Sequence, residues 1–444
     1  MITMEAIDTT IRPGSPPPTR WERTKVGAAN YVSHVRLFSR NAWLYLLGAF
    51  LIGVNFEIFQ LLLNLYLKEL GWGEGHIGLV NSSRAVGMTL MALPAALLLS
   101  RIQLKPVLMI ASVGFAAFTF GLSTAAALPV IIVFSILMGM AFTFSRVAAG
   151  PFYMRNSTPK ERTHLFSFSF GVLLVAGMVG SQVGGRLVSV MTNLAGNTIS
   201  GYRYTLYVAI GIGLLSLIPF ALLKASSATD DESRIHLNLA QLRSRGRFYF
   251  KITFSNFLIG LGAGLIIPFL NLYFREKFDL TPATIGSFYF CTVLVMFIGT
   301  MAGPILARRF GLVRTIVFTQ LASIPFMLLL AYTVSLPVAF MAYVMRAGLM
   351  NIGVPITTNV SMELSDRREQ GLVNALLMIA WNGSWMVSTA VGGSLIESYG
   401  FTLTFVITSG LYVISTLFYF WAFRGVEKHD QRAKRWSLIE AEEA

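Results

Sequence analysis

The sequence of 444 residues contains few of the groups that soluble enzymes use for chemistry. Its single cysteine, Cys291, excludes a disulfide framework and a thiolate metal cluster. The five histidines all lie in tails, loops or at the ends of apolar stretches, so a membrane-embedded histidine proton relay is not expected. A phosphate-binding Gly-x-x-x-x-Gly-Lys loop and a zinc-type His-Glu-x-x-His motif are both missing. These absences argue against ATP hydrolysis and a metal site, and no cofactor is predicted.

Charged residues are also scarce, at 13% of the chain, whereas hydrophobic residues make up 55%. This composition is typical of an integral membrane protein and not of a soluble domain. The net charge of +14 is not gathered into one continuous basic patch, so nucleic acid is not an expected partner. About twelve apolar stretches near the length of a membrane span lie between residues 42 and 423.

The positions of the basic residues indicate how the chain crosses the membrane. Most Lys and Arg residues fall in the termini and in alternate loops, which predicts that both termini are cytoplasmic. Only Lys68, Arg203, Arg275 and Lys277 lie in the opposite loops. The first residues lack the usual form of a cleavable signal and are interpreted as a cytoplasmic tail. Compact loops, short tails and the lack of an evident glycosylation sequon in the outer loops fit a bacterial inner membrane.

The two halves of the chain repeat each other at an offset of about 207 residues. The segment Asn64-Leu65-Tyr66 returns as Asn271-Leu272-Tyr273, and each copy is followed by a base and an acid, Lys68-Glu69 and Arg275-Glu276. Two halves with an even number of spans must be parallel repeats, related by an axis along the membrane normal. We therefore predict an all-α membrane protein with about twelve transmembrane helices, in two parallel six-helix repeats around a central cavity.

The predicted domains follow from the repeat and from the one long polar interval inside the chain. They are a cytoplasmic N-terminal tail (1–41), an N-terminal six-helix bundle (42–224), a cytoplasmic linker (225–250), a C-terminal six-helix bundle (251–424) and a cytoplasmic C-terminal tail (425–444).

This organisation resembles the major facilitator superfamily over residues 42–424. The resemblance implies a transporter whose first, fourth, seventh and tenth spans line the central cavity. The family's inner-loop motif is present in degraded form, and it implies either a conformational-switch loop or contacts with anionic inner-leaflet lipids. The residues matched to this motif are Arg101, Lys105, Gly303, Arg308, Arg309, Gly311 and Arg314.

A second motif lies in the fifth span, where small residues are frequent. Gly180, Ser181, Gly184 and Gly185 resemble the glycine motif of the antiporter branch of the superfamily, with serine in the place of a proline. The resemblance favours efflux, whereas close packing between helices is the alternative role of such a run.

Glu57 lies near the middle of the first apolar stretch and shares one helical face with Gly53, Gln60 and Asn64. A carboxylate at that depth costs at least a few kcal/mol, so it should face a partner or a water-filled cavity. Glu57 is therefore the predicted proton-coupling residue. A permanent ion pair with an arginine is the alternative.

Arginines outnumber acids within the predicted spans. Arg84, Arg146 and Arg346 keep their charge, so they either attract an anionic group or balance Glu57. In the eleventh span, an aromatic and methionine face either adapts to apolar or cationic ligands or packs against other helices. The predicted substrate-binding residues are Gln60, Asn64, Arg84, Arg146, Arg346, Met378, Trp381 and Trp385.

Together these features predict a secondary active transporter and not an enzyme. The leading hypothesis is proton-coupled export of an amphiphilic or hydrophobic small molecule by alternating access. The alternatives are an importer or facilitator of an organic anion, and a non-transporting receptor or assembly factor on the same fold. The expected partners are the small-molecule substrate, protons and membrane lipids. Because one chain supplies both halves, we expect it to function as a monomer.

Overall fold

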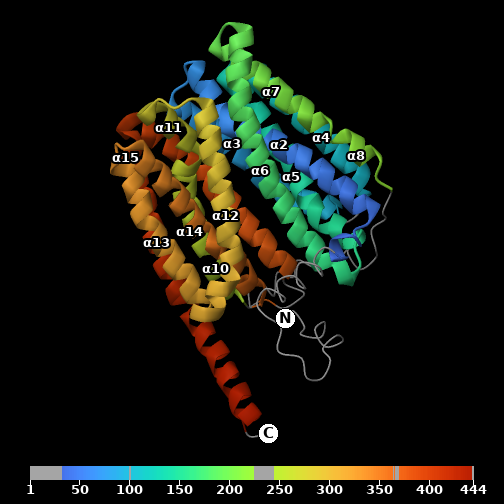
Figure 1. The fold of residues 1–444 in the computed structure, drawn as a ribbon, viewed down its shortest axis with the longest axis vertical. Coiled ribbons are helices and arrows are strands. Elements are labelled where there is room, and N and C mark those ends of the chain that lie inside the picture. Colours follow the sequence, from blue (N-terminus) through green and yellow to red (C-terminus); the bar gives the residue numbers. More distant parts are fainter. Residues whose placement is uncertain (1–32, 100–101, 225–244, 364, 366–369, 443–444) are drawn as a thin grey trace, which may run out of the picture.

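The computed structural model describes residues 33–99, 102–224, 245–363, 365 and 370–442. These residues form long helices joined by short connections (Figure 1). A helix satisfies its backbone hydrogen bonds internally, which is what a long apolar segment requires in lipid. In these ranges, eleven helices are long and apolar enough to cross a membrane.

The N-terminal bundle, drawn in blue to green in Figure 1, is built from the first half of the chain. Its elements are α2 (Arg40–Glu69), α3 (Glu74–Leu99), α4 (Leu104–Thr124), α5 (Leu128–Arg155), α6 (Pro159–Ala195), α7 (Thr198–Leu214) and α8 (Leu217–Ala221). The helices α7 and α8 follow one another closely and together form one span.

The C-terminal bundle, drawn in yellow to red, repeats this order. Its elements are α10 (Gly246–Ile266), η2 (Ile267–Phe269), α11 (Leu270–Phe278), α12 (Pro282–Phe310), α13 (Leu312–Tyr332), α14 (Leu336–Glu363) and α15 (Gln370–Glu442). The first three form one span, which is interrupted by a turn of 3-10 helix at Pro268.

The last helix explains why eleven apolar helices agree with about twelve expected spans. Helix α15 is assigned as continuous, but Gly400 inside it has a non-helical backbone with φ of 76° and ψ of 179°. Its apolar part covers Val373–Gly425, or 53 residues. At 1.5 Å per residue this is about 80 Å, more than twice the thickness of the hydrocarbon core. Gly400 therefore separates the expected eleventh and twelfth spans.

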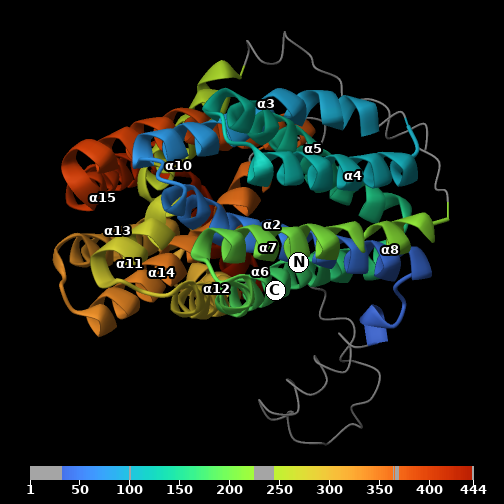
Figure 2. The same ribbon diagram turned by 90° about the horizontal axis from the view of Figure 1, so that it is seen from above.

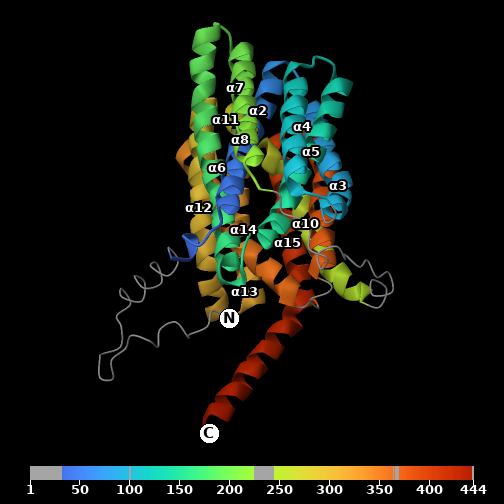
Figure 3. The ribbon, with the colours of Figure 1, turned by 90° about the vertical axis from the view of Figure 1, so that its right-hand side faces the viewer.

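Two expected domain limits differ from the helix limits. Helix α10 already begins at Gly246, inside the interval 225–250 that we interpret as the linker, and residues 225–244 of that interval lie outside the described residues. At the other end, α15 continues to Glu442 through most of the expected C-terminal tail, as the red helix in Figure 3 shows. The N-terminal tail is described only from residue 33.

The two bundles meet along two helix pairs. Helix α3 of the N-terminal bundle packs beside α15, and Figure 2 shows α6 beside α12. Glycines permit the close approach in both pairs. A Cβ atom added to Gly78 would lie 3.0 Å from the Cα of Gly393, and one added to Gly286 would lie 3.3 Å from the Cα of Gly185. These two contacts are related by the sequence repeat, so the fold has an approximate twofold axis between the bundles.

Candidate transport site

A cavity of about 310 Å³ lies inside the N-terminal bundle. Its volume is in the range of sites that bind small molecules. It is lined by residues of α2, α3, α4, α5, α6 and α8, namely Tyr45, Ala49, Ile52, Gly53, Phe56, Glu57, Met88, Leu108, Phe142, Ser145, Arg146, Leu173 and Phe220. The lining is mainly apolar and aromatic, with Glu57 and Arg146 as its two charged residues.

Glu57 lies on the wall of this cavity and is partly exposed. Its side chain packs against α6, where a Cβ atom added to Gly180 would lie 2.7 Å from the Cβ of Glu57. Gly177 is less tightly packed, because an added Cβ would lie 3.7 Å from the Glu57 Cδ. Among the described residues, no ion pair joins the Glu57 carboxylate to a basic side chain. The permanent ion pair that we considered as an alternative is therefore not formed in this conformation.

Two arginines flank a pair of stacked aromatic rings next to Glu57. The rings of Phe56 and Phe142 have centroids 4.1 Å apart. The guanidinium carbon of Arg84 lies 5.9 Å from the Phe56 centroid, and that of Arg146 lies 6.0 Å from the Phe142 centroid. Both are distances at which a cation is attracted to an aromatic face. Arg84 is buried, whereas Arg146 is exposed to the cavity, so Arg146 is the more accessible of the two cations.

The C-terminal bundle has no carboxylate at the position equivalent to Glu57, and its large and small residues are exchanged between the two packed helices. The repeat places Gly264 at the position of Glu57, and it places Trp385 at the position of Gly177. In the C-terminal bundle, a Cβ atom added to Gly264 would lie 3.3 Å from the Cα of Trp385. In the N-terminal bundle the large residue, Glu57, thus lies on the first span. In the C-terminal bundle the large residue, Trp385, lies on the eleventh span, which the repeat relates to the fifth. The site has one carboxylate and not two.

The remaining predicted residues of the central region differ in their surroundings. The rings of Trp381 and Trp385 lie 5.8 Å apart, and the Nε1 atom of Trp385 is buried without a hydrogen-bond partner in the described residues. The Oε1 atom of Gln60 is likewise buried and unpaired there. Met378 is half-buried on the same helix as the two tryptophans. Arg346 is buried in the C-terminal bundle and is described further below.

Asn64 lies between the bundles and bonds to protein groups. Its Nδ2 donates to the carbonyl of Pro268 at 2.6 Å, and its Oδ1 accepts from the Nδ2 of Asn81 at 3.0 Å. Asn271, the repeat partner of Asn64, donates from Nδ2 to the carbonyl of Leu61 at 2.7 Å. In this conformation the amide of Asn64 therefore holds the bundles together, while its role in substrate binding stays a prediction.

Ion pairs extend this contact beyond the asparagines. The Nζ of Lys68 lies 3.0 Å from an oxygen of Glu276, and Lys68 also pairs with Glu74. The repeat partner of the first pair joins Arg275 to Glu69 at 3.6 Å. We call the end of the molecule that carries these ion pairs and the two asparagines the gate end. At the opposite end, no hydrogen bond or ion pair between described residues joins the two bundles.

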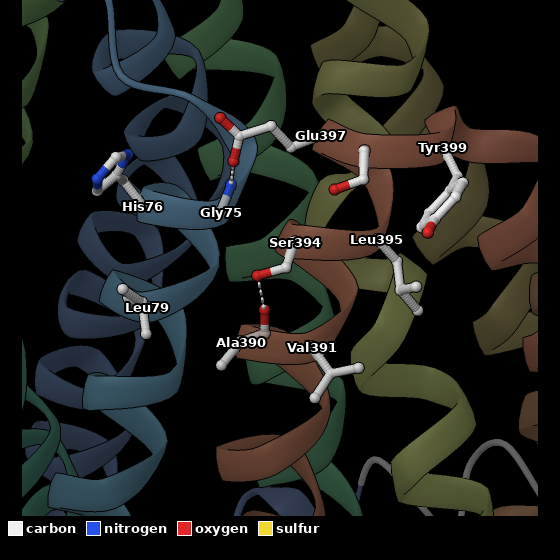
Figure 4. Close-up of a pocket in the computed structure, with 10 residues that line it drawn as sticks. Gly75, His76, Leu79, Ala390, Val391, Ser394, Leu395, Glu397 and Tyr399 are labelled. Atoms are coloured by element: carbon white, nitrogen blue, oxygen red, sulfur yellow. Dashed lines mark hydrogen bonds between the residues drawn. The ribbon is translucent and has the colours of Figure 1, made fainter.

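A second cavity, of about 620 Å³, lies at the gate end between α3 and α15. Figure 4 shows Glu397 of α15 reaching across to the first turn of α3, where its Oε2 accepts a hydrogen bond from the amide nitrogen of Gly75 at 2.9 Å. A carboxylate at a helix N-terminus is favourable because the free amide groups there point toward it. Glu397 adds a further bond that must break if the bundles separate at this end.

The glycine motif of α6 contacts both bundles. Gly184 packs against Ile58 of α2, where an added Cβ would lie 3.0 Å from a side-chain carbon. Gly185 faces Ala283 of α12, where the corresponding distance to the Cα is 3.1 Å. Ser181 is buried, and its hydroxyl donates to the carbonyl of Met178 at 3.1 Å. Close helix packing is therefore one role of the motif, and a role in antiport stays a prediction.

The predicted switch-loop residues lie at the end opposite the gate, except that Arg101 falls outside the described residues. Lys105 donates to the carbonyl of Leu223 at 3.2 Å and to that of Ala221, so it caps the last span of its own bundle. Near the α12–α13 turn, Gly311 has a φ of 92°, which favours glycine. Three arginines beside this turn are exposed, namely Arg308, Arg309 and Arg314.

Gly303 is buried between α12 and α14. An added Cβ atom there would lie 3.0 Å from the carbonyl oxygen of Ile352. Gly303 therefore permits the close packing of α12 on α14 within the C-terminal bundle.

Two repeated bundles of apolar helices, bonded to each other at the gate end, are the architecture of a polytopic membrane protein. A family model for the Major Facilitator Superfamily matches residues 45–249 and 252–441. The chain belongs to the Major Facilitator Superfamily. This membership indicates a transporter and not an enzyme, and it agrees with the resemblance found in the sequence.

Solved structures share the fold at low sequence identity. A bacterial homolog of the human lysosomal transporter Spinster, in an inward-facing and unoccupied conformation, is 14% identical with a TM-score of 0.73 over 86% of this chain and 96% of that chain. The nucleoside transporter NupG is 14% identical with a TM-score of 0.70 over 87% and 99%. The D-xylose-proton symporter is 15% identical with a TM-score of 0.67 over 88% and 97%. A search of curated proteins by sequence finds no match.

Proposed function

We propose that this protein is a proton-coupled secondary transporter that exports an amphiphilic or hydrophobic small molecule, with Glu57 as the group that carries the proton. The observation that carries the proposal is the position of Glu57 on the cavity wall without an ion pair among the described residues. A carboxylate changes its affinity for a proton when its surroundings become drier or when a cation approaches. Alternating exposure of the cavity to the two sides of the membrane supplies such changes.

The cavity wall supports an amphiphilic substrate. The stacked pair Phe56 and Phe142, together with Met88 and Leu108, offers an apolar surface beside Glu57 and Arg146. Methionine and aromatic surfaces adapt to ligands of different shapes. The glycine motif of α6 resembles that of the antiporter branch, and this resemblance favours export.

The proposed orientation places the gate end outside the cell and both termini in the cytoplasm of a bacterial cell. It rests on the distribution of Lys and Arg between the loops. In this orientation the protein is closed to the outside, and the exposed bases Arg308 and Arg309 lie at the cytoplasmic surface. Their charge suits anionic lipids of the inner leaflet. We propose that one chain is the functional unit.

The test is transport by purified protein in proteoliposomes, comparing the wild type with Glu57→Gln. A panel of lipophilic cations and organic anions is offered under an imposed pH gradient, and solute flux and internal pH are both recorded. We expect the gradient to drive solute flux in the wild type. Glu57→Gln should abolish this driven flux and keep solute exchange at equilibrium. Gradient-driven accumulation that survives Glu57→Gln would remove Glu57 from the coupling mechanism.

A facilitative carrier of organic anions is the second candidate. It is favoured by Arg84, Arg146 and Arg346, because arginines within the spans outnumber the single mid-span carboxylate. In the same assay this candidate gives anion flux that needs no pH gradient and is unaffected by Glu57→Gln. Its flux should be lost in Arg346→Ala.

A further inference from the structure

The C-terminal bundle contains a buried cation, Arg346, whereas its acids lie near the ends of the spans. Arg346 of α14 is 5% exposed, and its Nε atom has no hydrogen-bond partner among the described residues. The sequence places no Asp or Glu in the middle of any span of this bundle. A buried arginine keeps its charge, and a buried charge without a counter-ion is energetically unfavourable. Such a residue is expected to have a counter-ion at some stage of the transport cycle.

Tyrosines from three helices surround this cation. Tyr412 of α15 is fully buried and is an electrostatic neighbour of Arg346. Tyr343 of α14 and Tyr289 of α12 are also electrostatic neighbours of Arg346, and their ring centroids lie 5.9 Å apart. Hydroxyl groups satisfy part of the guanidinium without neutralising it, because a tyrosine at neutral pH is uncharged.

The tyrosines near Arg346 also lie close to the other bundle. Tyr289 and Tyr343 are also electrostatic neighbours of Glu57 in the other bundle. Arg346 therefore lies next to the central region between the bundles and not at the lipid-facing surface.

We propose that Arg346, with the hydroxyls of Tyr343 and Tyr412, binds the anionic head group of an amphiphilic organic anion whose apolar body packs against the aromatic rings beside Arg346. The guanidinium suits carboxylate, sulfonate and phosphate groups, because its planar fork donates two parallel hydrogen bonds to them. The statement that this anion is the transported molecule rests on the proposed function, whereas the binding site itself does not.

Three probes with the same pyrene body and different head groups test the site. Pyrenebutyrate is anionic, pyrenebutanol is neutral and pyrenebutylamine is cationic, and each is titrated into purified full-length protein. Binding is read from energy transfer between tryptophan and pyrene. In the wild type, we expect pyrenebutyrate to bind about tenfold or more tightly than the other two probes.

Variants assign this preference to Arg346. Arg346→Gln should weaken pyrenebutyrate binding by about tenfold or more and change pyrenebutanol binding by less than about twofold. Arg346→Lys should fall between the wild type and Arg346→Gln, and Tyr412→Phe should weaken binding a few-fold. Arg424→Gln removes a positive charge at an exposed position of α15 and should leave all three affinities unchanged. Each variant is compared with the wild type for monodisperse elution and for Tm.

The outcomes separate this inference from the proposed function. Equal affinity of the wild type for the three probes, or no binding of pyrenebutyrate up to its solubility limit, would overturn the anion site. Unchanged pyrenebutyrate affinity in folded Arg346→Gln, with Tyr412→Phe also unchanged, would overturn it as well. If proton coupling fails in proteoliposomes while Arg346 still sets the affinity, the proposed function falls and the anion site stands.

Discussion

Asn64 and Asn271 each donate a hydrogen bond to the backbone carbonyl of the residue three positions before the other. Asn64 bonds to Pro268 at 2.6 Å, and Asn271 bonds to Leu61 at 2.7 Å. The two bonds are exchanged across the approximate twofold axis, so each bundle gives one donor and one acceptor. Because each bond joins the two bundles, separation of the bundles at the gate end breaks both together.

Replacing either asparagine should favour opening of the gate end. Each neutral hydrogen bond is worth about 1 kcal/mol, which is about a fivefold change in the ratio of closed to open protein. We expect Asn64→Leu and Asn271→Leu to produce similar shifts, since the bonds are equivalent. Spin labels at Leu194→Cys and Val334→Cys, both exposed at the gate end, report the opening as a distance in a Cys291→Ser background. A distance distribution unchanged in both variants would show that these bonds do not set the equilibrium.

The ion pair between Lys68 and Glu276 should contribute less than the asparagines. Both side chains are about one-third exposed, and such pairs are worth roughly 0.2 to 1 kcal/mol and are weakened by salt. Lys68→Glu places an acid beside Glu74 and Glu276, so it should open the gate end a few-fold. The double variant Lys68→Glu with Glu276→Lys should restore closure. The same spin-label distances, recorded at low and high salt, check this, and failure of the double variant to restore closure would exclude a direct pairing.

A side chain at Gly286 should keep the gate end from closing. An added Cβ atom there would lie 3.3 Å from the Cα of Gly185 and closer still to the carbonyl oxygen of Ser181 in the other bundle. We expect Gly286→Val to leave each bundle folded, to lengthen the gate-end distance and to reduce transport by about tenfold or more. The matched control is Gly410→Val, where an added Cβ meets no atom within 4 Å. Equal loss of transport in the two variants would point to a general effect on helix stability.

Two glycines beside Glu57 provide a graded test of its surroundings. A Cβ atom at Gly180 would lie 2.7 Å from the Glu57 Cβ and 2.9 Å from the carbonyl oxygen of Val54, so Gly180→Ala must displace the carboxylate or the helix. At Gly177 the nearest atom would be 3.7 Å away, which is an ordinary contact. We expect Gly180→Ala to lower driven flux by about tenfold or more and Gly177→Ala by less than about threefold, as measured in proteoliposomes. Comparable effects would show that the packing at Gly180 does not position Glu57.

The sequence repeat predicts much of the gate, because residues at equivalent positions meet near a twofold axis. Asn64 and Asn271 are matched in the repeat, as are the base and acid pairs that follow them. In the structure these residues contact each other across the axis. The sequence repeat is sufficient to predict these contacts, because residues at equivalent positions of the two bundles meet where they lie close to the twofold axis.

The sequence singles out Arg346 as a candidate substrate-binding residue, which stays a prediction, but it does not identify the residues around Arg346. Its neighbours Tyr289, Tyr343 and Tyr412 come from three helices and are spread over more than a hundred residues of sequence, a separation given by their numbers. The chain has 15 Tyr and 34 Phe residues, so three tyrosines carry no signal that distinguishes them from lipid-facing aromatics. Only the rotation of each helix about its axis decides which of them face the arginine. The sequence predicts that Glu57 faces a partner or a cavity, whereas its tight contact with Gly180 follows only from the packing of α6 on α2.

Gly264 stands where the repeat would place an equivalent of Glu57, and this affects the free energy available to drive transport. If Glu57 carries the proton, one chain moves one proton in each cycle. One elementary charge moved through about 100 mV releases about 2.3 kcal/mol. That free energy supports a concentration ratio of about fiftyfold for an uncharged substrate. With Glu57 as the proton carrier, the single carboxylate would limit how steep a solute gradient the protein can maintain at a given membrane voltage.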